Sequence, residues 1–283
     1  MATRKVTNTV QGYRTQDGAG VSLVRVLGNE TVYDFDPFLM LDSFDSTDPR
    51  SWQAGFPTHP HRGIETVTFI SQGSISHRDN LGNEATVGNG EVQWLTAGSG
   101  AFHSEFPSAE NRLLGLQMWL NLKAEDKMTD PYYHSIFSSE IKEIPIRGGK
   151  LRLLTGNFGS EKGFQSPHLP LDYYDIHLEP NARLTIPTDK DRSCMVFTLQ
   201  GDAVVGGTHI APKTAAKLGE GDEVSIEAGD KGCQIMFMSS IATNEPVAWR
   251  GPIVMNTMGE LRQAIEELND GTFVKVKTNY SNK

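Results

Sequence analysis

The chain has 283 residues and a formal net charge of −9, and this length fits one large domain or two medium ones with well-packed cores. Its 26 Lys and Arg residues form no dense basic block, and no apolar run has the length of a signal peptide or a membrane span, so we expect a cytoplasmic protein that binds neither nucleic acid nor membranes. The two cysteines, Cys194 and Cys233, are too few and too far apart for a disulfide framework or a thiolate zinc site, and we assign them no role.

Short stretches rich in Val, Ile, Thr and Phe alternate with glycines along most of the chain, a pattern typical of many short β-strands joined by turns. The clearest predicted strands cover residues 66–70 and 195–199. The charged stretch 123–143 is the natural connection between two halves, with a boundary near residue 140. Near the C-terminus, Thr257-x-x-Glu260 resembles a capping box and predicts a packing helix without chemistry of its own.

An internal repeat links the two halves. Phe69-x-x-Gln72-Gly73 recurs as Phe197-x-x-Gln200-Gly201, at an offset of 128. A Gly-(x)7-Gly pattern with Ala before the second Gly begins at Gly90 and again at Gly221, at an offset of 131. Either match alone is weak, but their shared order and similar offsets indicate two copies of one β-unit.

Two pairs of polar residues with alternating spacing form the candidate functional site. Successive side chains of a strand point to opposite faces, so His59 and His61 project from one side, and so do His103 and Glu105. Taken singly, each histidine is better explained as a surface or core residue. Taken together, three imidazoles and one carboxylate suit a divalent Fe, Mn, Co, Ni, Cu or Zn ion better than Ca or Mg.

Longer motifs around these residues resemble the pirin family of the cupin superfamily. In chain order they are DPFLMLD (36–42), THPHRGIETVT (58–68), GEVQWLTAG (90–98), HSE (103–105) and EPV through GP to MNT (245–257). The resemblance implies an all-β bicupin, with two tandem antiparallel β-barrels of the jelly-roll type and a short C-terminal helix. Residues 1–140 would form the metal-binding barrel, and residues 141–283 would form a degenerate barrel that carries the helix.

The resemblance also places His59, His61, His103 and Glu105 at the family's metal-ligand positions, which usually hold iron. Many other cupins use the glutamate of the first motif instead, which in this chain is Glu65. Since Glu65 follows His61 by four residues, it would share a strand face with that histidine. We favour Glu105 as the ligand and expect Glu65 to orient a ligand imidazole.

The second copy is expected to bind no metal. The offset of 128 takes His59 and His61 to Pro187 and Asp189, and the offset of 131 takes His103 and Glu105 to Gln234 and Met236. None of the three histidines is retained, so one ion per chain is expected.

The activity that the family suggests is that of quercetin 2,3-dioxygenase, in which a flavonol and O2 give a depside and carbon monoxide. In this scheme Glu105 would act twice, as a metal ligand and as the general base that accepts the flavonol hydroxyl proton. The alternative is a regulator without catalysis, in which the oxidation state of the iron controls binding to a transcription factor or a metabolic enzyme. Both readings need the same four residues, and the sequence does not separate them.

Overall fold

The structure, a computed structural model, describes residues 2–276, which form strands and turns together with one α-helix in this range. The chain divides into two compact units that are both discontinuous in sequence. We call the first the histidine unit; it contains Arg14–Leu23, Phe38–Ser135 and the chain from Thr243 onwards. We call the second the aliphatic unit; it contains the chain up to Tyr13, Val24–Pro37 and Ile136–Ala242.

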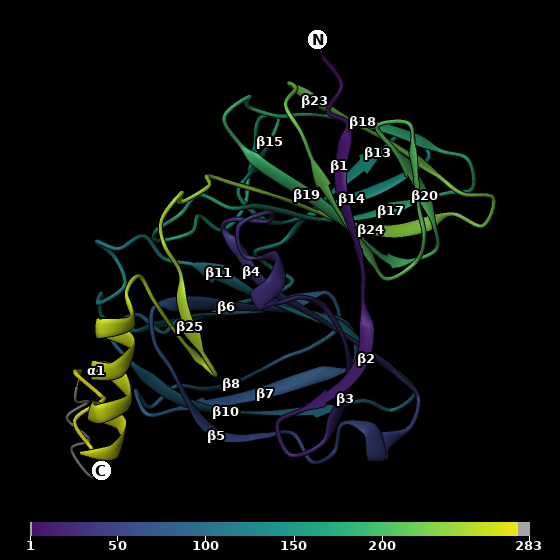
Figure 1. Ribbon diagram of the computed structural model, residues 1–283. Coiled ribbons are helices and arrows are strands. Elements are labelled where there is room, and N and C mark those ends of the chain that lie inside the picture. The colour runs from purple at the N-terminus through teal and green to yellow at the C-terminus, as the bar shows by residue number, and fades with distance from the viewer. Residues whose placement is uncertain (1, 277–283) are drawn as a thin grey trace. The chain divides into compact units, whose positions relative to one another are not determined.

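Two antiparallel sheets carry the histidine unit, and Figure 1 shows β6 and β11 in one layer and β7, β8 and β10 in the other. In sheet order, the larger sheet contains β12 (Tyr132–Ile136), β9 (Glu91–Thr96), β6 (Ile64–Gln72), β11 (Leu113–Asn121), β4 (Phe38–Ser46), β3 (Val21–Leu27) and β2 (Tyr13–Asp17). The smaller sheet contains β5 (Phe56–His61), β10 (Ala101–Ser108), β7 (Ser74–Asp79) and β8 (Glu84–Val87). The pair β25 (Ala248–Arg250) and β26 (Ile253–Met255), the helix α1 (Met258–Asn269) and the 3-10 turn η2 (Pro49–Ser51) complete the unit.

The aliphatic unit has the same two-sheet plan. Its larger sheet contains β1 (Val6–Gln11), β22 (Thr214–Leu218), β19 (Ser193–Gln200), β24 (Cys233–Ser240), β17 (Asp172–Leu178), β14 (Gly149–Thr155) and β13 (Lys142–Ile146). Its smaller sheet contains β18 (Arg183–Pro187), β23 (Glu223–Ala228), β20 (Ala203–Val205) and β21 (Thr208–Ile210). The hairpin β15 (Asn157–Phe158) and β16 (Glu161–Lys162) and the 3-10 turn η1 (Asn29–Thr31) are the remaining elements.

The internal repeat is confirmed by strand order, because β4 to β11 take the same places in their sheets as β17 to β24. The FxxQG match is structurally equivalent, since Gln72 ends β6 and Gln200 ends β19, and each is followed by glycine. The second match is wrong. Gly90 precedes β9 of a larger sheet, whereas Gly221 precedes β23 of a smaller one, so the offset of 131 joins strands that are not equivalent.

The predicted all-β fold with a short C-terminal helix is confirmed. Thr257 caps α1 as expected: its hydroxyl accepts from the Glu260 backbone N–H, and the Glu260 carboxylate accepts from the Thr257 backbone N–H. One apolar face of α1 is buried through Leu261 and Ala264. Among the described residues, no helix is long and apolar enough to cross a membrane.

The compact units differ from the single boundary near residue 140 that the sequence suggested. Leu261 and Ala264 of α1 pack in a cluster with Met255 and Phe273, and the partly buried Phe102 of β10 joins them, so the C-terminal segment belongs to the histidine unit. At the other end, β1 pairs antiparallel with β22 and belongs to the aliphatic unit. A single boundary in the sequence therefore does not separate the units, because the aliphatic unit includes the N-terminal strand β1 and the histidine unit includes the C-terminal helix α1.

Candidate metal centre

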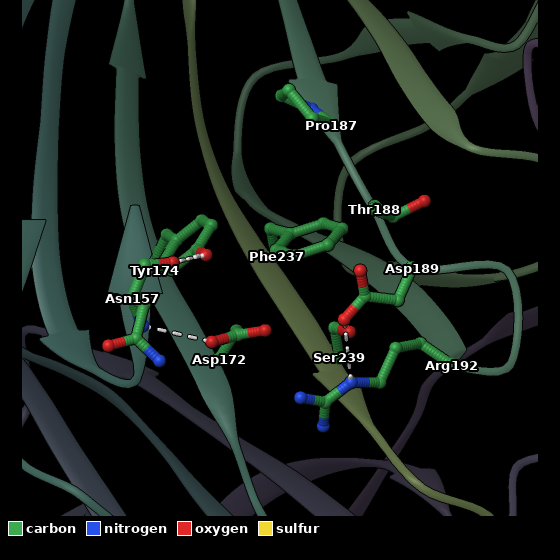
Figure 2. A pocket seen from close by; sticks show the side chains of 9 residues that line it. All are labelled: Asn157, Asp172, Tyr174, Pro187, Thr188, Asp189, Arg192, Phe237 and Ser239. Carbon is green, nitrogen blue, oxygen red and sulfur yellow. Dashed lines mark hydrogen bonds and ion pairs between the residues drawn. The ribbon is translucent and has the colours of Figure 1, made fainter. Parts of the chain in front are cut away.

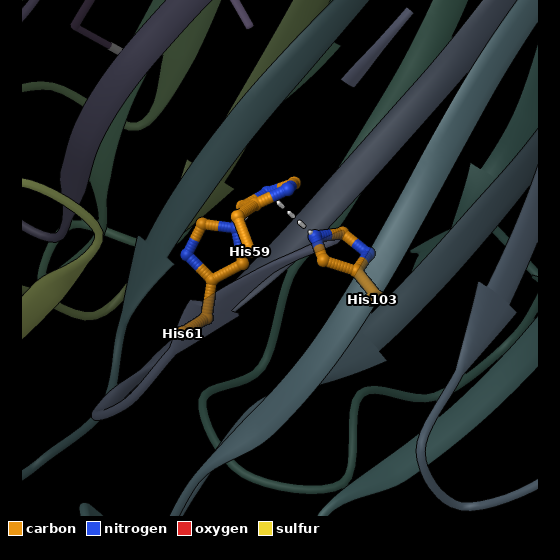
Figure 3. A group of neighbouring side chains, drawn as sticks. All are labelled: His59, His61 and His103. Atoms are coloured by element: carbon orange, nitrogen blue, oxygen red, sulfur yellow. Dashed lines mark hydrogen bonds between the residues drawn. The ribbon is translucent and has the colours of Figure 1, made fainter. Parts of the chain in front are cut away.

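The three predicted histidine ligands come together on the pair of strands β5 and β10. His59 lies directly opposite His103 in the antiparallel register, and His61 lies two residues further along β5. The ligand nitrogens of all three lie within 4.8 Å of one another (Figure 3). The Nε2 atom of His59 is 3.0 Å from Nε2 of His61 and 3.0 Å from Nε2 of His103. The alternation of side chains along strands thus brings three imidazoles to one point.

The hydrogen bonds on the outer side of two rings determine which nitrogen is free. Nδ1 of His59 lies 2.8 Å from the Pro57 carbonyl oxygen, and Nδ1 of His61 lies 3.1 Å from the Pro252 carbonyl oxygen. Because a carbonyl oxygen only accepts, each Nδ1 must carry the proton and donate it. In the neutral rings both Nε2 atoms then hold lone pairs that face each other, an arrangement that a shared cation would stabilise.

Burial favours the neutral form of the His61 and His103 rings. It lowers the pKa of His61 to about 3, with the neighbouring His59 adding to the effect. It also lowers the pKa of His103 well below the usual value, with contributions from His61, His59 and His77. Neutral imidazole is the form that binds a metal ion, so the donor set fits a divalent ion of the first transition row.

Glu105 is buried on the same strand as His103, but it is not part of the three-histidine cluster. Its carboxylate oxygens accept hydrogen bonds from the side-chain amides of Gln93 and Gln117, the latter at 2.9 Å. Within residues 2–276, no Lys or Arg side chain pairs with it. A buried carboxylate that has amide donors and no cation partner leaves a negative charge to be balanced, and a bound metal ion would balance it.

The expected place of Glu65 is wrong. The turn at Arg62 and Gly63 ends β5 and starts β6 in the other sheet, so Glu65 and His61 do not share a strand. The Glu65 carboxylate accepts from Trp94 Nε1 at 3.1 Å and from Thr96 Oγ1 at 2.6 Å, so these residues and not a ligand imidazole are its recorded partners. Burial raises the pKa of Glu65 to about 7.

The turn that follows His61 is held by the buried side chains of Arg62 and Lys127. Arg62 donates to the carbonyl oxygens of Ser99 and Phe273, each at 2.7 Å, and pairs with Glu267 at 2.7 Å. Its guanidinium lies 4.2 Å from the centre of the Phe273 ring. Lys127 donates to the Gly63 carbonyl oxygen at 2.9 Å. These contacts tie the histidine-bearing strand to the C-terminal segment, the segment that also supplies the Pro252 carbonyl.

Sequence reasoning missed His77 and Asp79 on β7. Nδ1 of His77 lies 3.4 Å from Nδ1 of His103, and Nε2 of His77 lies 3.1 Å from Oδ2 of Asp79. The His77 ring stacks on Tyr133, with 4.0 Å between the ring centres and 12° between the planes. Burial opposes ionisation of Asp79, but hydrogen bonds from His77 and Asn83 hold its pKa below the usual value. The signal in the sequence was the His77-x-Asp79 spacing, which places both side chains on one face of a strand.

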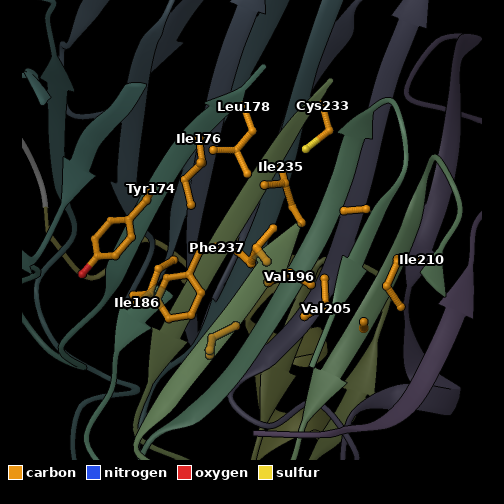
Figure 4. Close-up of a cluster of buried hydrophobic side chains, with 14 of the residues drawn as sticks. Tyr174, Ile176, Leu178, Ile186, Val196, Val205, Ile210, Cys233, Ile235 and Phe237 are labelled. Carbon is orange, nitrogen blue, oxygen red and sulfur yellow. The ribbon is translucent and has the colours of Figure 1, made fainter. Parts of the chain in front are cut away.

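Aliphatic residues take the equivalent positions in the other unit. When the two FxxQG motifs are aligned, Val205 is the equivalent of His77. Val205 lies opposite Ile226 on the neighbouring strand, in the same way that His77 lies opposite Glu105. One step along the same face, Val224 lies opposite Ile186 as His103 lies opposite His59. All four aliphatic residues belong to one buried cluster, in which Figure 4 labels Ile186 and Val205.

These equivalences correct the counterparts that the sequence offsets suggested. Gln234 and Met236 lie on β24, which is equivalent to β11 and not to β10. Pro187 and Asp189 line a pocket of about 250 Å³ in which Asp189 pairs with Arg192 at 3.8 Å (Figure 2). Within residues 2–276, the cluster of His59, His61 and His103 is the one group of three or more His, Cys, Asp or Glu side chains whose ligand atoms lie close enough together to share a metal ion.

Comparisons with known proteins agree with this architecture. Residues 20–120 match the pirin family, and residues 173–274 match the pirin C-terminal cupin domain. A pirin-like protein from Caulobacter vibrioides is 36% identical over 96% of this chain and 100% of its own, and human pirin is 34% identical over 98% of this chain and 97% of its own. A crystal structure of quercetin 2,3-dioxygenase from Acinetobacter baumannii is 32% identical, covers 96% of this chain and 99% of its own, and superposes with a TM-score of 0.89. The chain therefore belongs to the pirin family and consists of two cupin domains.

Proposed function

We propose that the protein is a metal-dependent dioxygenase that binds one iron ion per chain on His59, His61 and His103 and cleaves a flavonol such as quercetin with O2. The observation that carries the proposal is the convergence of three imidazoles, with Nε2 of His59 3.0 Å from Nε2 of each of the other two, beside the buried Glu105, which has no Lys or Arg partner among the described residues. The likeness to the Acinetobacter quercetin 2,3-dioxygenase supports the reaction class. Both cysteines are free and buried, which is in keeping with a reducing, cytoplasmic setting.

Glu105 has two roles in this proposal. A bound ferrous ion with open coordination positions would supply a place for a chelating substrate and for O2. Glu105 would complete the ligand set and accept the proton of the flavonol 3-hydroxyl group on a carboxylate oxygen. Its amide partners, Gln93 and Gln117, hold this carboxylate in a fixed orientation.

Other polar groups near the centre are available to a hydroxylated aromatic substrate. Thr66 Oγ1, Gln93 Oε1 and Trp119 Nε1 are buried and have no hydrogen-bond partner among the described residues. Trp119 packs against the His61 ring at 5.0 Å between ring centres, and Thr66 lies opposite Trp119 in the sheet register. Unpaired buried polar atoms are unfavourable, so a ligand with hydroxyl groups would gain by pairing with them.

The test is to load the protein with Fe(II) without oxygen and then to measure oxygen uptake and carbon monoxide release with and without quercetin. The metal content should be close to one ion per chain. His103→Ala should lose the ion and the activity, whereas the matched His177→Ala, in the aliphatic unit, should keep both. Parallel loading with Mn, Co, Ni, Cu and Zn identifies the metal that supports turnover.

The outcomes separate the proposal from its alternative. Oxygen uptake that depends on both iron and flavonol supports the dioxygenase. Stoichiometric iron without any flavonol-dependent uptake would favour a regulator whose partner affinity follows the oxidation state of the iron. Two ions per chain, or an ion retained in His103→Ala, would contradict the proposed centre itself.

A further inference from the structure

A chain of hydrogen bonds runs outward from His103 on the side away from the other two ligands. His103 contacts His77 through the two Nδ1 atoms at 3.4 Å, and His77 contacts Asp79 through Nε2 and Oδ2 at 3.1 Å. The side chains of His77 and Asp79 are both inaccessible to solvent. Solvent therefore does not compete for these hydrogen bonds, and each polar atom of the three side chains needs a partner from the protein.

Asp79 sets the direction of the chain. Its Oδ1 accepts from the backbone N–H groups of Leu81 and Asn83, each at 2.9 Å, and its Oδ2 accepts from the Asn83 side-chain amide at 2.9 Å. An ionised carboxylate only accepts, so Nε2 of His77 must donate to it. A His77 ring that carries its proton on Nε2 has a lone pair on Nδ1, which can accept the Nδ1 proton of His103.

We infer that Asp79 and His77 are positioning residues that fix the proton of His103 on Nδ1 and so keep its Nε2 lone pair turned toward the metal ion. His59 and His61 obtain the same tautomer from the carbonyl oxygens of Pro57 and Pro252. The tautomer of His103 is set by the Asp79 carboxylate, which acts through the His77 ring. A carboxylate behind a histidine ligand raises the basicity of that ligand, so the pair also strengthens the bond to the ion. This inference rests on the proposed metal centre but not on the flavonol chemistry.

Asp79→Asn tests the direction of the chain. The backbone N–H groups of Leu81 and Asn83 require the asparagine carbonyl at the Oδ1 position, so the asparagine NH2 group must face His77. His77 would then accept on Nε2 and carry its proton on Nδ1, which drives the His103 proton onto Nε2. We expect Co(II) affinity, measured by competition with a chromophoric chelator, to fall by about 10-fold to 100-fold.

Asp79→Ala distinguishes this effect from a structural one. Alanine imposes no tautomer on His77, so its Co(II) affinity should lie between those of wild type and Asp79→Asn. Alanine removes the acceptor of the turn at Leu81 and Asn83, so its melting temperature should be the lower of the two. If Asp79 had only a structural role, the variant with the lower melting temperature would also have the lower Co(II) affinity.

A pair of variants at His77 separates hydrogen bonding from packing. His77→Asn keeps an acceptor near the position of Nδ1 but loses the ring that stacks on Tyr133, whereas His77→Phe keeps the ring and loses the acceptor. We expect the Asn variant to bind Co(II) more tightly than the Phe variant and to retain more of the wild-type Co(II) absorption spectrum. Tighter binding by the Phe variant would overturn the inference.

Asp175→Asn is the matched control. Asp175 is buried and accepts from Nε2 of His177 at 3.0 Å, but it lies in the aliphatic unit. The Co(II) affinity of the Asp175→Asn protein should equal that of wild type. If wild type binds Co(II) and Asp79→Asn binds it equally well, the inference is refuted while the metal centre stands. If wild type binds no metal ion, the proposed centre itself fails.

Discussion

Glu65→Gln gives a stability change whose pH dependence follows from the structure. The Glu65 carboxyl group is fully buried, and burial raises its pKa from 4.5 to about 7. Between these two values the native protein holds a proton that the unfolded chain releases, so the free energy of unfolding falls as the pH rises through this window. A change of about 2.5 pKa units corresponds to about 3 kcal/mol at 1.36 kcal/mol per unit.

Glutamine does not titrate, and its carbonyl oxygen can still accept from Trp94 and Thr96. The unfolding free energy of Glu65→Gln minus that of wild type should therefore increase by about 3 kcal/mol between pH 4 and pH 8. Urea unfolding of the metal-free proteins measures this difference, and the other titrating groups cancel in it. Tryptophan fluorescence is the appropriate signal, because all 4 Trp residues lie in the histidine unit.

A difference that stays constant with pH would refute this reasoning, because it would mean that folding does not raise the pKa of Glu65. The same variant also tests the rival ligand. Since the recorded partners of Glu65 are Trp94 and Thr96, Glu65→Gln should bind one metal ion as tightly as wild type. A folded variant without metal would restore Glu65 as a ligand.

Three further predictions concern the scaffold. Arg62→Met should cost about 1–3 kcal/mol because it removes the donor from the buried carbonyl oxygens of Ser99 and Phe273. Arg78→Met, at an exposed ion pair, should cost less than about 1 kcal/mol in the same urea assay. Ile226→Ala should destabilise the aliphatic unit by about 2–5 kcal/mol, followed by circular dichroism, without changing the metal content. Gly98→Ala should lower both stability and metal affinity, since the added Cβ would lie 2.2 Å from the Thr129 carbonyl oxygen. Gly159→Ala, where φ is +59° and no atom lies within 4 Å of the added Cβ, should show only the cost of the backbone conformation.

The histidine cluster was predictable because strand alternation gave two matching pairs of side chains and the resemblance to the pirin family placed both pairs in one site. Alternation along a strand places His59 and His61 on one face, and the motif around His103 identified a second strand with a matching face. The strand patterns and the capping box at Thr257 were local signals too, and the structure confirms them. Local rules of this kind do not depend on which strands become neighbours.

Other features that depend on strand pairing, and for which no motif was identified, were not predictable. His77 and Asp79 have the same alternating spacing, but only the register of β7 against β10 brings them to His103. The carbonyl of Pro252 reaches His61 across 191 positions of sequence. Glu65 was misplaced because the turn at Gly63, where φ is +76°, moves the chain from one sheet to the other.

The discontinuous units also determine the order in which the chain becomes complete during synthesis. The last strand of the aliphatic unit, β24, ends at Ser240, so that unit has all its strands while the C-terminal segment of the histidine unit is still being made. Until residues 252–273 leave the ribosome, His61 lacks the Pro252 carbonyl and Arg62 lacks both Phe273 and Glu267. The histidine unit, which holds the strands β4 to β11, is thus completed after the aliphatic unit, which holds β17 to β24.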